Sequence, residues 1–272
     1  APILLFLVPG RLVAQSAEES PYGVLVMAHG GSQEWNRTVA EAVRAAEIPY
    51  EVEIAFGMAD AVSLQDAVER LEARGVRRIG VVRLFISGES WTERTEQILG
   101  LVAGAPPRPT VPAPNSPGGH SMAFWRIGTR SDFVLSREGL ADDSAIGAVL
   151  VDRVRAVSAE PAREDVLVLA HGPGDDAENG RWLALIDQRS EAIRQALPFR
   201  RVQVMTLRED WPEKRESAQE AIRSFVARAT AEGGRALVIP FRVQGLGPYA
   251  EVLEGLDYVA DRQGLLPHAV TS

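Results

Sequence analysis

The chain has 272 residues, of which 46% are hydrophobic and 24% are charged, and its formal net charge at pH 7 is −8. This length suits two domains of ordinary size, each able to bury its own core. The negative charge argues against nucleic acid as a partner, because phosphates require a basic surface. The lack of cysteine excludes disulfides, iron–sulfur clusters and thiol catalysis.

Residues 1–20 predict a leader segment rather than part of a domain. Residues 3–8 form an apolar run that is too short to span a bilayer, and a zone of small residues follows near 14–17. This order resembles the hydrophobic region and the cleavage zone of a secretory signal. We therefore expect an exported or periplasmic protein without integral membrane contact, and a cytoplasmic location is the alternative.

Strand and helix patterns alternate along residues 21–160, the predicted N-terminal domain. The predicted strands are apolar runs of strand character, at 22–28, 52–56, 76–86 and 132–135. The predicted helices have apolar residues at helical spacing, at 34–47, 63–73, 92–101 and 143–157. Ser63 is the expected cap of the second helix, and the Pro-rich residues 105–119 predict an irregular loop. This order predicts a parallel sheet with helices on both faces.

Residues 161–272, the predicted C-terminal domain, repeat the same order. The predicted strands are at 166–170, 202–207 and 236–241. The predicted helices are at 177–196 and 212–230, with a third that begins after Pro248 and ends near Gly264. The fold class we expect is therefore α/β, with two tandem units that each have a parallel sheet flanked by helices.

A direct repeat supports this division. The sequence VLVMAHG at 24–30 returns as VLVLAHG at 166–172, so each unit has an apolar strand that ends in Ala-His-Gly. The stretch IAFGMAD at 54–60 has the same place in the first unit as VMTLRED at 204–210 in the second. Agreement at successive strand ends indicates a duplication with parallel architecture.

His29 is the first candidate for chemistry. It follows a strand and precedes a helix, which is where open α/β sheets bind ligands. A neutral imidazole there can ligate a divalent transition metal or accept a proton near neutral pH. Gly30, Gly31 and Ser32 let the backbone approach a ligand closely and offer amides at a helix N-terminus. The alternative is a histidine held in its turn by a backbone hydrogen bond.

Glu89 is the second candidate. It lies in the turn after the strand at 76–86, so in a parallel sheet it emerges at the same edge as His29. A histidine and a carboxylate that face each other across a cleft can bind a metal ion and accept protons from a substrate nitrogen. The alternative is a solvent-exposed glutamate at the start of a helix.

Three stretches give the chain a family resemblance. LVMAHGG at 25–31, FGMA at 56–59 and RLFIS at 83–87 are similar to the CbiX-type sirohydrochlorin chelatases, in their two-domain long form, over residues 22 to about 260. The resemblance implies two tandem chelatase-like domains that insert a divalent metal into sirohydrochlorin or a related tetrapyrrole without ATP. Co²⁺ is the favoured metal substrate, Ni²⁺ and Fe²⁺ are alternatives, and no organic cofactor is implied. The resemblance leaves open whether the protein forms a homodimer.

The resemblance also implies roles for single residues. His29 takes the place of the first catalytic histidine and ligates the metal, and Glu89 stands where the family has a second histidine. His171 is a further metal ligand, but the matching turn of the second copy, at 244–247, has no ionisable group, so we expect a degenerate second site. The residues expected to contact the macrocycle are Gly30, Gly31, Ser32 and Arg83.

A carboxylate-rich macrocycle also needs cationic partners. The candidates by position are Arg83, Arg94, Arg126 and Arg242. Side chains that can reach a planar ring or its metal are Trp35, Trp91, Trp125 and, in the Pro-rich loop, His120. For each of these residues an ordinary place on the surface or in the core is the alternative.

Two other classes of function stay open. The sequence GESWT at 88–92 nearly matches a nucleophile elbow around Ser90, and Asp257 and His268 complete the residue order of an α/β-hydrolase-type esterase. Thr92 stands where the elbow has glycine, however, and a hydrolase gives no reason for the Ala-His-Gly repeat. The other class is an exported, non-catalytic protein that binds metal or tetrapyrrole.

Overall fold

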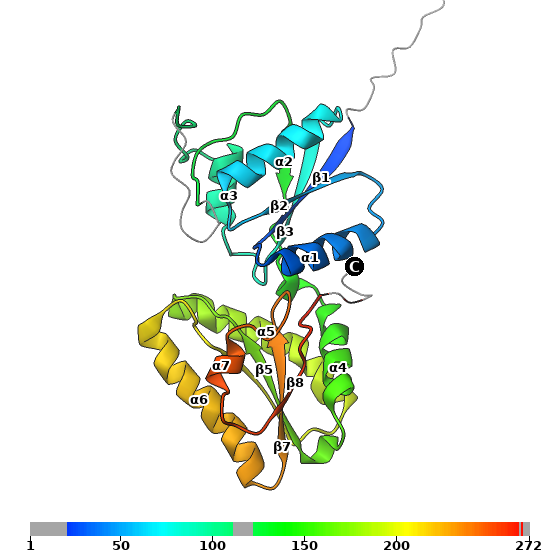
Figure 1. The fold of residues 1–272 in the computed structure, drawn as a ribbon, viewed down its shortest axis with the longest axis vertical. Coiled ribbons are helices and arrows are strands. Elements are labelled where there is room, and N and C mark those ends of the chain that lie inside the picture. The colour runs from blue at the N-terminus through cyan, green and yellow to red at the C-terminus, as the bar shows by residue number, and fades with distance from the viewer. Residues whose placement is uncertain (1–20, 111–121, 267, 269–272) are drawn as a thin grey trace, which may run out of the picture.

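The computed structural model describes residues 21–110, 122–266 and 268, which form two α/β units stacked one above the other (Figure 1). The expected leader and His120 lie outside the described residues. Within the described ranges, no helix has the length and the apolar character needed to cross a membrane.

The first unit has a sheet of four parallel strands in the order β2-β1-β3-β4. The strands are β1 (Tyr22–Ala28), β2 (Glu51–Phe56), β3 (Arg78–Leu84) and β4 (Asp132–Leu135). The helices between them are α1 (Gln33–Ala45), α2 (Ala61–Ala73) and α3 (Thr92–Leu99). All seven elements were expected from the sequence, with differences of a few residues at their ends.

The second unit has four parallel strands in the matching order β6-β5-β7-β8. The strands are β5 (Glu164–Ala170), β6 (Arg201–Thr206), β7 (Arg235–Phe241) and β8 (Val259–Ala260). The helices of this part of the chain are α4 (Ile146–Val157), α5 (Asp176–Ala196), α6 (Pro212–Ala231) and α7 (Tyr249–Val252), with short 3₁₀ turns at Leu140–Asp142 and Pro161–Arg163. The predicted fold class, parallel sheets flanked by helices in both units, is confirmed.

The register places both Ala-His-Gly turns at the same edge of their sheets. Ala28 of β1 pairs with the last residues of β2 and β3, and Ala170 of β5 pairs with the last residues of β6 and β7. His29 and His171 therefore follow the central strand of each sheet, at the carboxyl edge where parallel sheets bind ligands.

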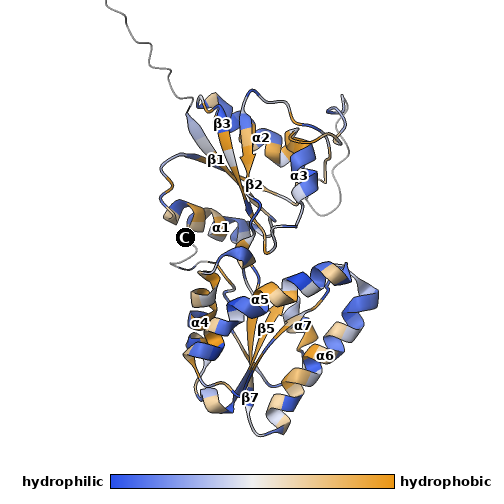
Figure 2. Cartoon of the chain, turned by 180° about the vertical axis from the view of Figure 1, so that it is seen from behind, coloured by the Kyte–Doolittle hydropathy of each residue, from blue (hydrophilic) through white to orange (hydrophobic). Residues whose placement is uncertain are grey.

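The cores follow from the burial of the strands. All seven residues of β5 are buried, as expected for a central strand covered by helices on both faces. Figure 2 shows hydrophobic colouring along the strands of both sheets and a mixture of both colours along the helices, which have an outer face in water. Each sheet therefore has a core of its own.

The helix α4 does not belong to the first unit, where the sequence analysis placed it. Leu150 and Val154 of α4 lie in one core cluster with Val166 of β5, and Figure 1 shows α4 beside the second sheet. By this packing the second unit begins before α4 and not at residue 161. The sequence pattern showed that α4 is amphipathic, but it did not show which sheet covers its apolar face.

The two units also share a small apolar cluster. Ala28 at the end of β1 and Val39 of α1 pack with Val243 and Leu266 of the second unit. Leu266, at the end of the second described range, therefore lies against α1. The carboxyl edges of both sheets are therefore held against each other.

Two expectations about helix ends are corrected. The side chain of Asp60 caps α2 by accepting a hydrogen bond from the backbone N–H of Ser63 at 3.0 Å, so Asp60 has the role expected of Ser63. The long helix expected after Pro248 is only the short α7, because the chain reaches Gly255 with a φ of +79° and then forms β8.

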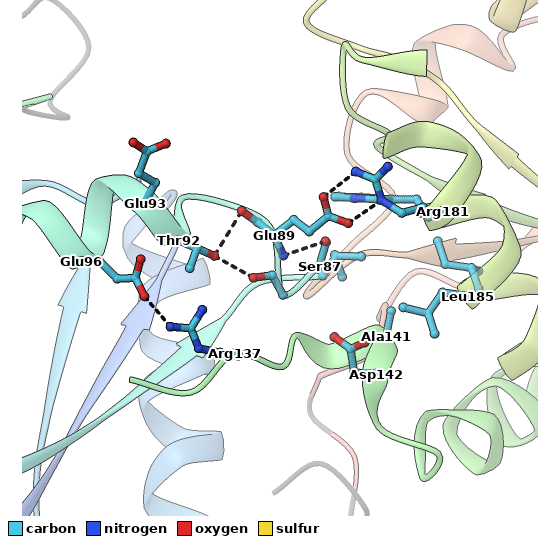
Figure 3. A pocket seen from close by; sticks show the side chains of 14 residues that line it. Ser87, Glu89, Thr92, Glu93, Glu96, Arg137, Ala141, Asp142, Arg181 and Leu185 are labelled. Carbon is cyan, nitrogen blue, oxygen red and sulfur yellow. Dashed lines mark hydrogen bonds and ion pairs between the residues drawn. The ribbon is translucent and has the colours of Figure 1, made fainter. Parts of the chain in front are cut away.

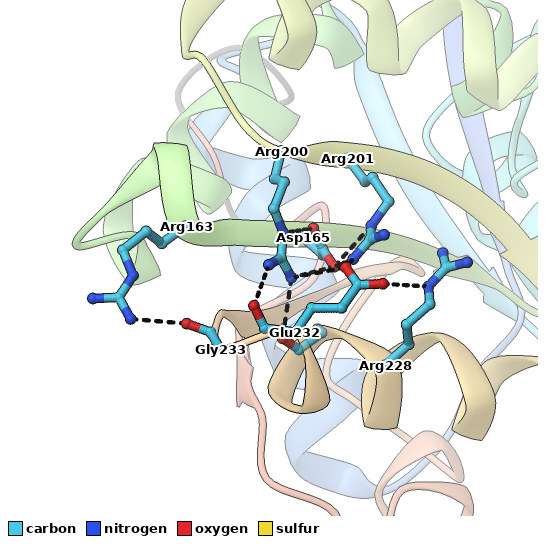
Figure 4. Close-up of polar contacts among 8 residues, drawn as sticks. Arg163, Asp165, Arg200, Arg201, Arg228, Glu232 and Gly233 are labelled. Atoms are coloured by element: carbon cyan, nitrogen blue, oxygen red, sulfur yellow. Dashed lines mark hydrogen bonds and ion pairs between the residues drawn. The ribbon is translucent and has the colours of Figure 1, made fainter.

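A cluster of charged side chains lies at the end of the second sheet that is away from His171. Asp165, at the start of β5, is fully buried and accepts hydrogen bonds from Arg200 at 2.8 and 2.9 Å and from Arg201 at 2.9 and 2.5 Å (Figure 4). Glu232, just after α6, binds Arg201 as well. This network joins β5, the start of β6 and the end of α6.

Candidate functional site

A cleft of about 840 Å³ lies between the carboxyl edges of the two sheets. It is lined by residues that follow β1, β3, β5, β6 and β7, and these include His29, Glu89 and His171. The structure thus brings the three expected metal-binding residues to one cavity. Gly30 and Gly31 line it as well, whereas Ser32 and Arg83 do not.

The turn after β1 leaves one nitrogen of His29 available. The ring Nδ1 lies 2.8 Å from the carbonyl oxygen of Gly30, which can only accept a hydrogen bond, so Nδ1 carries the hydrogen. In the neutral ring the lone pair is then on Nε2, and within the described ranges no hydrogen bond or ion pair is recorded for that atom. Gly30 has a φ of +80°, which favours glycine. His29 is therefore an exposed imidazole ready to act as a ligand.

The residues after Gly30 start α1 instead of offering free groups to a ligand. The N–H of Gly31 donates to Oδ1 of Asn36 at 2.9 Å, and Oγ of Ser32 accepts from the N–H of Trp35 at 3.1 Å. Ser32 is thus the helix cap. Gly31 still lines the cleft, but Ser32 does not, so the contact expected of Ser32 with the macrocycle is not supported by this geometry.

Arg83 holds the loop between β3 and α3 that carries Glu89, which we call the Glu89 loop. Its guanidinium is buried and donates to Gly88 O at 2.7 Å, to Ser90 O at 2.8 Å and to Ser136 O at 3.0 Å. These bonds hold the chain between β3 and α3 in one conformation. The expectation that Arg83 contacts the macrocycle is corrected, because its donors all face the interior.

Glu89 reaches across to the second unit. Its two carboxylate oxygens accept hydrogen bonds from Arg181 of α5, at 2.8 and 2.6 Å (Figure 3). Both side chains are about half exposed. The hydrogen bonds from Arg181 hold the pKa of Glu89 below its ordinary value, so Glu89 is ionised at neutral pH. Arg181 also lines a second cavity of about 480 Å³, which shares Glu89 and Trp182 with the cleft.

His171 has the same turn but a different partner. Its Nδ1 lies 2.7 Å from Gly172 O, as in the first copy, while Nε2 lies 2.9 Å from Oδ2 of Asp210 and 3.4 Å from Oε1 of Glu209. The carboxylates of Asp210 and Glu209 therefore occupy the side of the ring from which Nε2 could bind a metal ion. Of the two histidines, His29 is the one prepared to bind a metal.

Glu209 and Asp210 were missed as site residues. The sequence analysis aligned them with the first copy but looked for an ionisable partner of His171 only at 244–247. The second site therefore does contain ionisable partners for its histidine, contrary to the expectation of a degenerate site. These carboxylates follow β6 and not β7. The available signal was a Glu-Asp pair directly after a strand that neighbours β5.

The described residues contain no group of three or more His, Cys, Asp or Glu side chains arranged to hold a metal ion. His29, Glu89 and His171 line one cleft without converging as a ready cluster. The metal in the expected reaction is a substrate, which a macrocycle receives during turnover.

Aromatic side chains make up much of the cleft wall. The tryptophans among them are Trp35, Trp91, Trp182 and Trp211. Trp91 has a φ of +59°, a conformation that side chains rarely adopt, so the loop between β3 and α3 holds it under strain. Trp125, the other expected tryptophan, is buried in the first core instead. The cleft thus offers flat apolar surfaces of the kind that bind a planar ring.

The esterase interpretation gains no support from this geometry. Ser90 lines the cleft, but neither Asp257 nor His268 does. His268 lies 3.1 Å from Asp152 of α4. The nucleophile, acid and base required by a hydrolase are therefore not assembled there.

Comparison with known proteins agrees with the chelatase resemblance. Residues 23–103 match the CbiX family model. SirB from Bacillus subtilis with Fe³⁺ has a TM-score of 0.60 at 12% identity, with 92% of this chain and 91% of that chain covered. The sirohydrochlorin chelatase SirB from Bacillus subtilis subspecies spizizenii in complex with cobalt has a TM-score of 0.59 at 12% identity, with the same coverage.

A third structure is larger than this chain. A multi-domain protein from Deinococcus radiodurans, with structural similarity to chelatases and two additional novel domains, has a TM-score of 0.54 at 21% identity. The alignment covers 93% of this chain and 53% of that protein, so the chain spans about half its length. A comparison with curated protein sequences found no match. The resemblance to the CbiX-type chelatases is thereby confirmed, with residues 23–103 as the segment that matches the family model and a chelatase-like fold in both units.

Proposed function

We propose that the protein inserts a divalent metal ion into sirohydrochlorin or a related tetrapyrrole without ATP. The observation that carries this proposal is the free Nε2 of His29 in a cleft that Glu89 and several tryptophans line. The CbiX match of residues 23–103 and the fold shared with SirB support it. Co²⁺ is our first choice of metal, although imidazole and carboxylate ligands also accept Ni²⁺ and Fe²⁺.

The chemistry needs a ligand for the metal and an acceptor for protons. His29 Nε2 donates its lone pair to the incoming metal ion, and the macrocycle stacks on the tryptophans. As the macrocycle nitrogens bind the metal, the two pyrrole N–H protons leave. Glu89, ionised at neutral pH, accepts a proton once its bonds to Arg181 open, and passes it to water. The products are the metallated ring and two protons, so charge and atoms balance.

The test is an anaerobic absorbance assay with sirohydrochlorin and Co²⁺. We expect the wild type to convert the spectrum faster than the uncatalysed reaction, and His29→Ala to abolish this gain. His171→Ala is the matched control, because Nε2 of His171 is already engaged by carboxylates. Equal rates for wild type and His29→Ala, or greater loss in His171→Ala, would overturn the proposal.

A non-catalytic binding protein is the second candidate. The observation that favours it is the bidentate pairing of Glu89 with Arg181, which occupies the proposed proton acceptor. Such a protein shifts the absorbance of a tetrapyrrole without converting it to the metal complex. Spectra that change on binding but never reach those of authentic cobalt–sirohydrochlorin would support this candidate over the chelatase.

A further inference from the structure

Arg181 lies where the cleft meets the second cavity, which we call the side cavity. Glu89 and Trp182 line both spaces, whereas Arg181 lines only the side cavity. With about 480 Å³, the side cavity has room for acidic side chains at the edge of a macrocycle. A ring that stacks on Trp182 in the cleft can therefore extend such a side chain toward Arg181.

Glu89 occupies only one edge of the Arg181 guanidinium. It accepts hydrogen bonds from Nε at 2.8 Å and from Nη2 at 2.6 Å (Figure 3). Among the described residues, no hydrogen bond is recorded for Nη1. Nη1 and Nη2 form a second edge that can hold a carboxylate with two N–H groups. A carboxylate of a ligand can thus bind Arg181 before Glu89 leaves it.

The pair between Glu89 and Arg181 opens easily. Both side chains are about half exposed, and exposed ion pairs contribute little net stability because water and salt screen them. A macrocycle in the cleft excludes water from one side of Arg181, so a carboxylate that arrives with the ring is screened less. The exchange of Glu89 for such a carboxylate therefore favours the ligand.

The partner of Arg181 decides the state of Glu89. A guanidinium stays protonated at neutral pH, so Arg181 releases Glu89 only by taking another acceptor. While it is paired, Glu89 has a pKa below its ordinary value and accepts a proton poorly. Once Glu89 is released its affinity for a proton rises, and it still lines the cleft. The proton acceptor thus becomes available when the macrocycle is in place.

The other cations near the cleft are less available to a ligand. The side chain of Arg242 is 28% exposed and is already paired with a carboxylate. Arg208 is 10% exposed and Lys214 is 30% exposed, and both bind Asp176. Arg181, at 56%, is the most exposed of these four side chains.

The arginines expected from the sequence lie away from the cleft. Arg83 is buried and donates to carbonyls of its own loop. Arg94 donates to the backbone oxygens of Ala59 and Ala123, and Arg126 lines a separate cavity. None of these three arginines lines the cleft. The recognition of an acidic macrocycle therefore depends on another residue.

Three further carboxylates line the side cavity, and each has a partner within the first unit. The pairs are Glu93 with the amide of Gln97, Glu96 with Arg137, and Asp142 with the backbone N–H of Gly139. These carboxylates therefore do not compete with a ligand for Arg181.

We propose that Arg181 binds a carboxylate side chain of the macrocycle and, by exchanging Glu89 for it, frees Glu89 for the reaction. The inference rests on the proposed chelatase function and deepens it, because it names a residue that recognises the acidic edge of the ring. It predicts that a macrocycle without carboxylates stacks in the cleft but leaves Glu89 paired.

The experiment crosses the charge of the ligand with the charge at position 181. Sirohydrochlorin and its fully esterified, neutral form are compared in the same mild detergent, with the wild-type full chain and with Arg181→Ala. Quenching of tryptophan fluorescence gives the affinity, and anaerobic absorbance gives the rate of Co²⁺ insertion at saturating ring and metal. Arg194→Ala is the matched control, because Arg194 also lies on α5 and pairs with Asp187 outside the cleft.

The two ligands are expected to respond in opposite ways. Arg181→Ala should weaken sirohydrochlorin binding by about tenfold, because one charge-assisted pair is lost, and should leave the affinity for the ester unchanged. Insertion into the bound ester should be about tenfold slower in the wild type than in Arg181→Ala, where nothing holds Glu89. Arg194→Ala should match the wild type with both ligands.

The outcomes separate this inference from the function on which it rests. Equal sirohydrochlorin affinity of wild type and Arg181→Ala, in a protein that inserts metal, overturns the inference alone. Equal losses with sirohydrochlorin and its ester overturn it too, because Arg181 then only supports the structure of the site. Absence of insertion in every variant, with sirohydrochlorin binding still weakened by Arg181→Ala, overturns the proposed function and supports the binding step of the inference.

Discussion

Arg181 of the second unit donates hydrogen bonds to both carboxylate oxygens of Glu89 in the first unit, at 2.8 and 2.6 Å. A metal ion that uses Glu89 as a ligand must displace this guanidinium. Arg181→Ala is therefore expected to strengthen Co²⁺ binding by about tenfold, because the carboxylate is then free. Isothermal titration of Co²⁺ measures the effect.

The matched control for this prediction is Arg194→Ala. Arg194 also lies on α5 and also pairs with a carboxylate, Asp187, but it is outside the cleft. Its loss should leave Co²⁺ affinity unchanged. Weaker Co²⁺ binding in Arg181→Ala would mean that Arg181 positions Glu89 for the metal, instead of competing with it.

Glu89→Ala separates the binding of a macrocycle from the insertion of metal. The variant loses the proton acceptor, so we expect insertion to slow by about 100-fold. Tetrapyrrole affinity should hold within about threefold, because the tryptophan surfaces remain. Stopped-flow absorbance gives the insertion rate and fluorescence quenching gives the affinity. An unchanged insertion rate would remove Glu89 from the mechanism.

The position of His29 and a backbone hydrogen bond within its turn could be predicted from the sequence, whereas the carboxylate partners of His171 could not. An apolar run followed by Ala-His-Gly is a local pattern, and the geometry of parallel strands then places the imidazole at the carboxyl edge. The pairing of Glu89 with Arg181 depends instead on how two separate units approach each other. No spacing along the chain encodes that approach.

The same reasoning explains the misplaced helix α4. Its apolar face was visible in the sequence, but both sheets offer a complementary surface. Packing of Leu150 and Val154 against Val166 decides between them. Arg83 was misjudged for a related reason, because a charged residue at a strand end was expected to face a ligand. It lies under its own loop, where backbone carbonyls satisfy it.

Asp165→Asn is expected to destabilise the second unit. The buried carboxylate holds Arg200 and Arg201 together, and a neutral amide leaves both guanidinium groups poorly compensated. Loss of one partner of a buried ion pair costs about 3 kcal/mol of unfolding free energy. Urea denaturation measures it, with Asp66→Asn on the exposed face of α2 as the control. Equal midpoints for the two variants would contradict this account.

Stability is also expected to fall in acid because of two buried carboxylates at the start of β5. Burial alone raises the pKa of both, but hydrogen bonds and neighbouring arginines outweigh it, so the pKa values of Glu164 and Asp165 lie below their ordinary 4.5 and 3.8. At pH values above those ordinary pKa values, both ionised groups therefore stabilise the folded state. The stabilisation is lost as pH falls below about 4.5 toward the lower folded-state values.

Urea unfolding at a series of pH values between neutrality and acid measures this loss. Asp165→Asn should show a shallower fall, because one of the two titrating groups is gone. A wild-type urea midpoint that stays constant from neutral to acid pH would contradict the prediction. The unfolding free energy falls with pH because the pKa values are lower in the folded state, so the unfolded chain binds protons at a higher pH than the folded one.

Arg83→Met tests whether the Glu89 loop depends on the guanidinium beneath it. Methionine fills much of the same volume but leaves the carbonyls of Gly88, Ser90 and Ser136 without their donor. We expect a loss of about 2–4 kcal/mol in unfolding free energy. Insertion should slow as well, because the loop no longer holds Glu89 at its place in the cleft.

The control for this last prediction is Arg137→Met. Arg137 is close by and pairs with Glu96, but its side chain is 75% exposed, so its loss should change stability by no more than about 0.5 kcal/mol. If Arg83→Met loses as little unfolding free energy as Arg137→Met and keeps full insertion activity, the loop holds its shape without the guanidinium. Slower insertion with unchanged macrocycle affinity would instead show that Arg83 acts on the reaction through the position of Glu89.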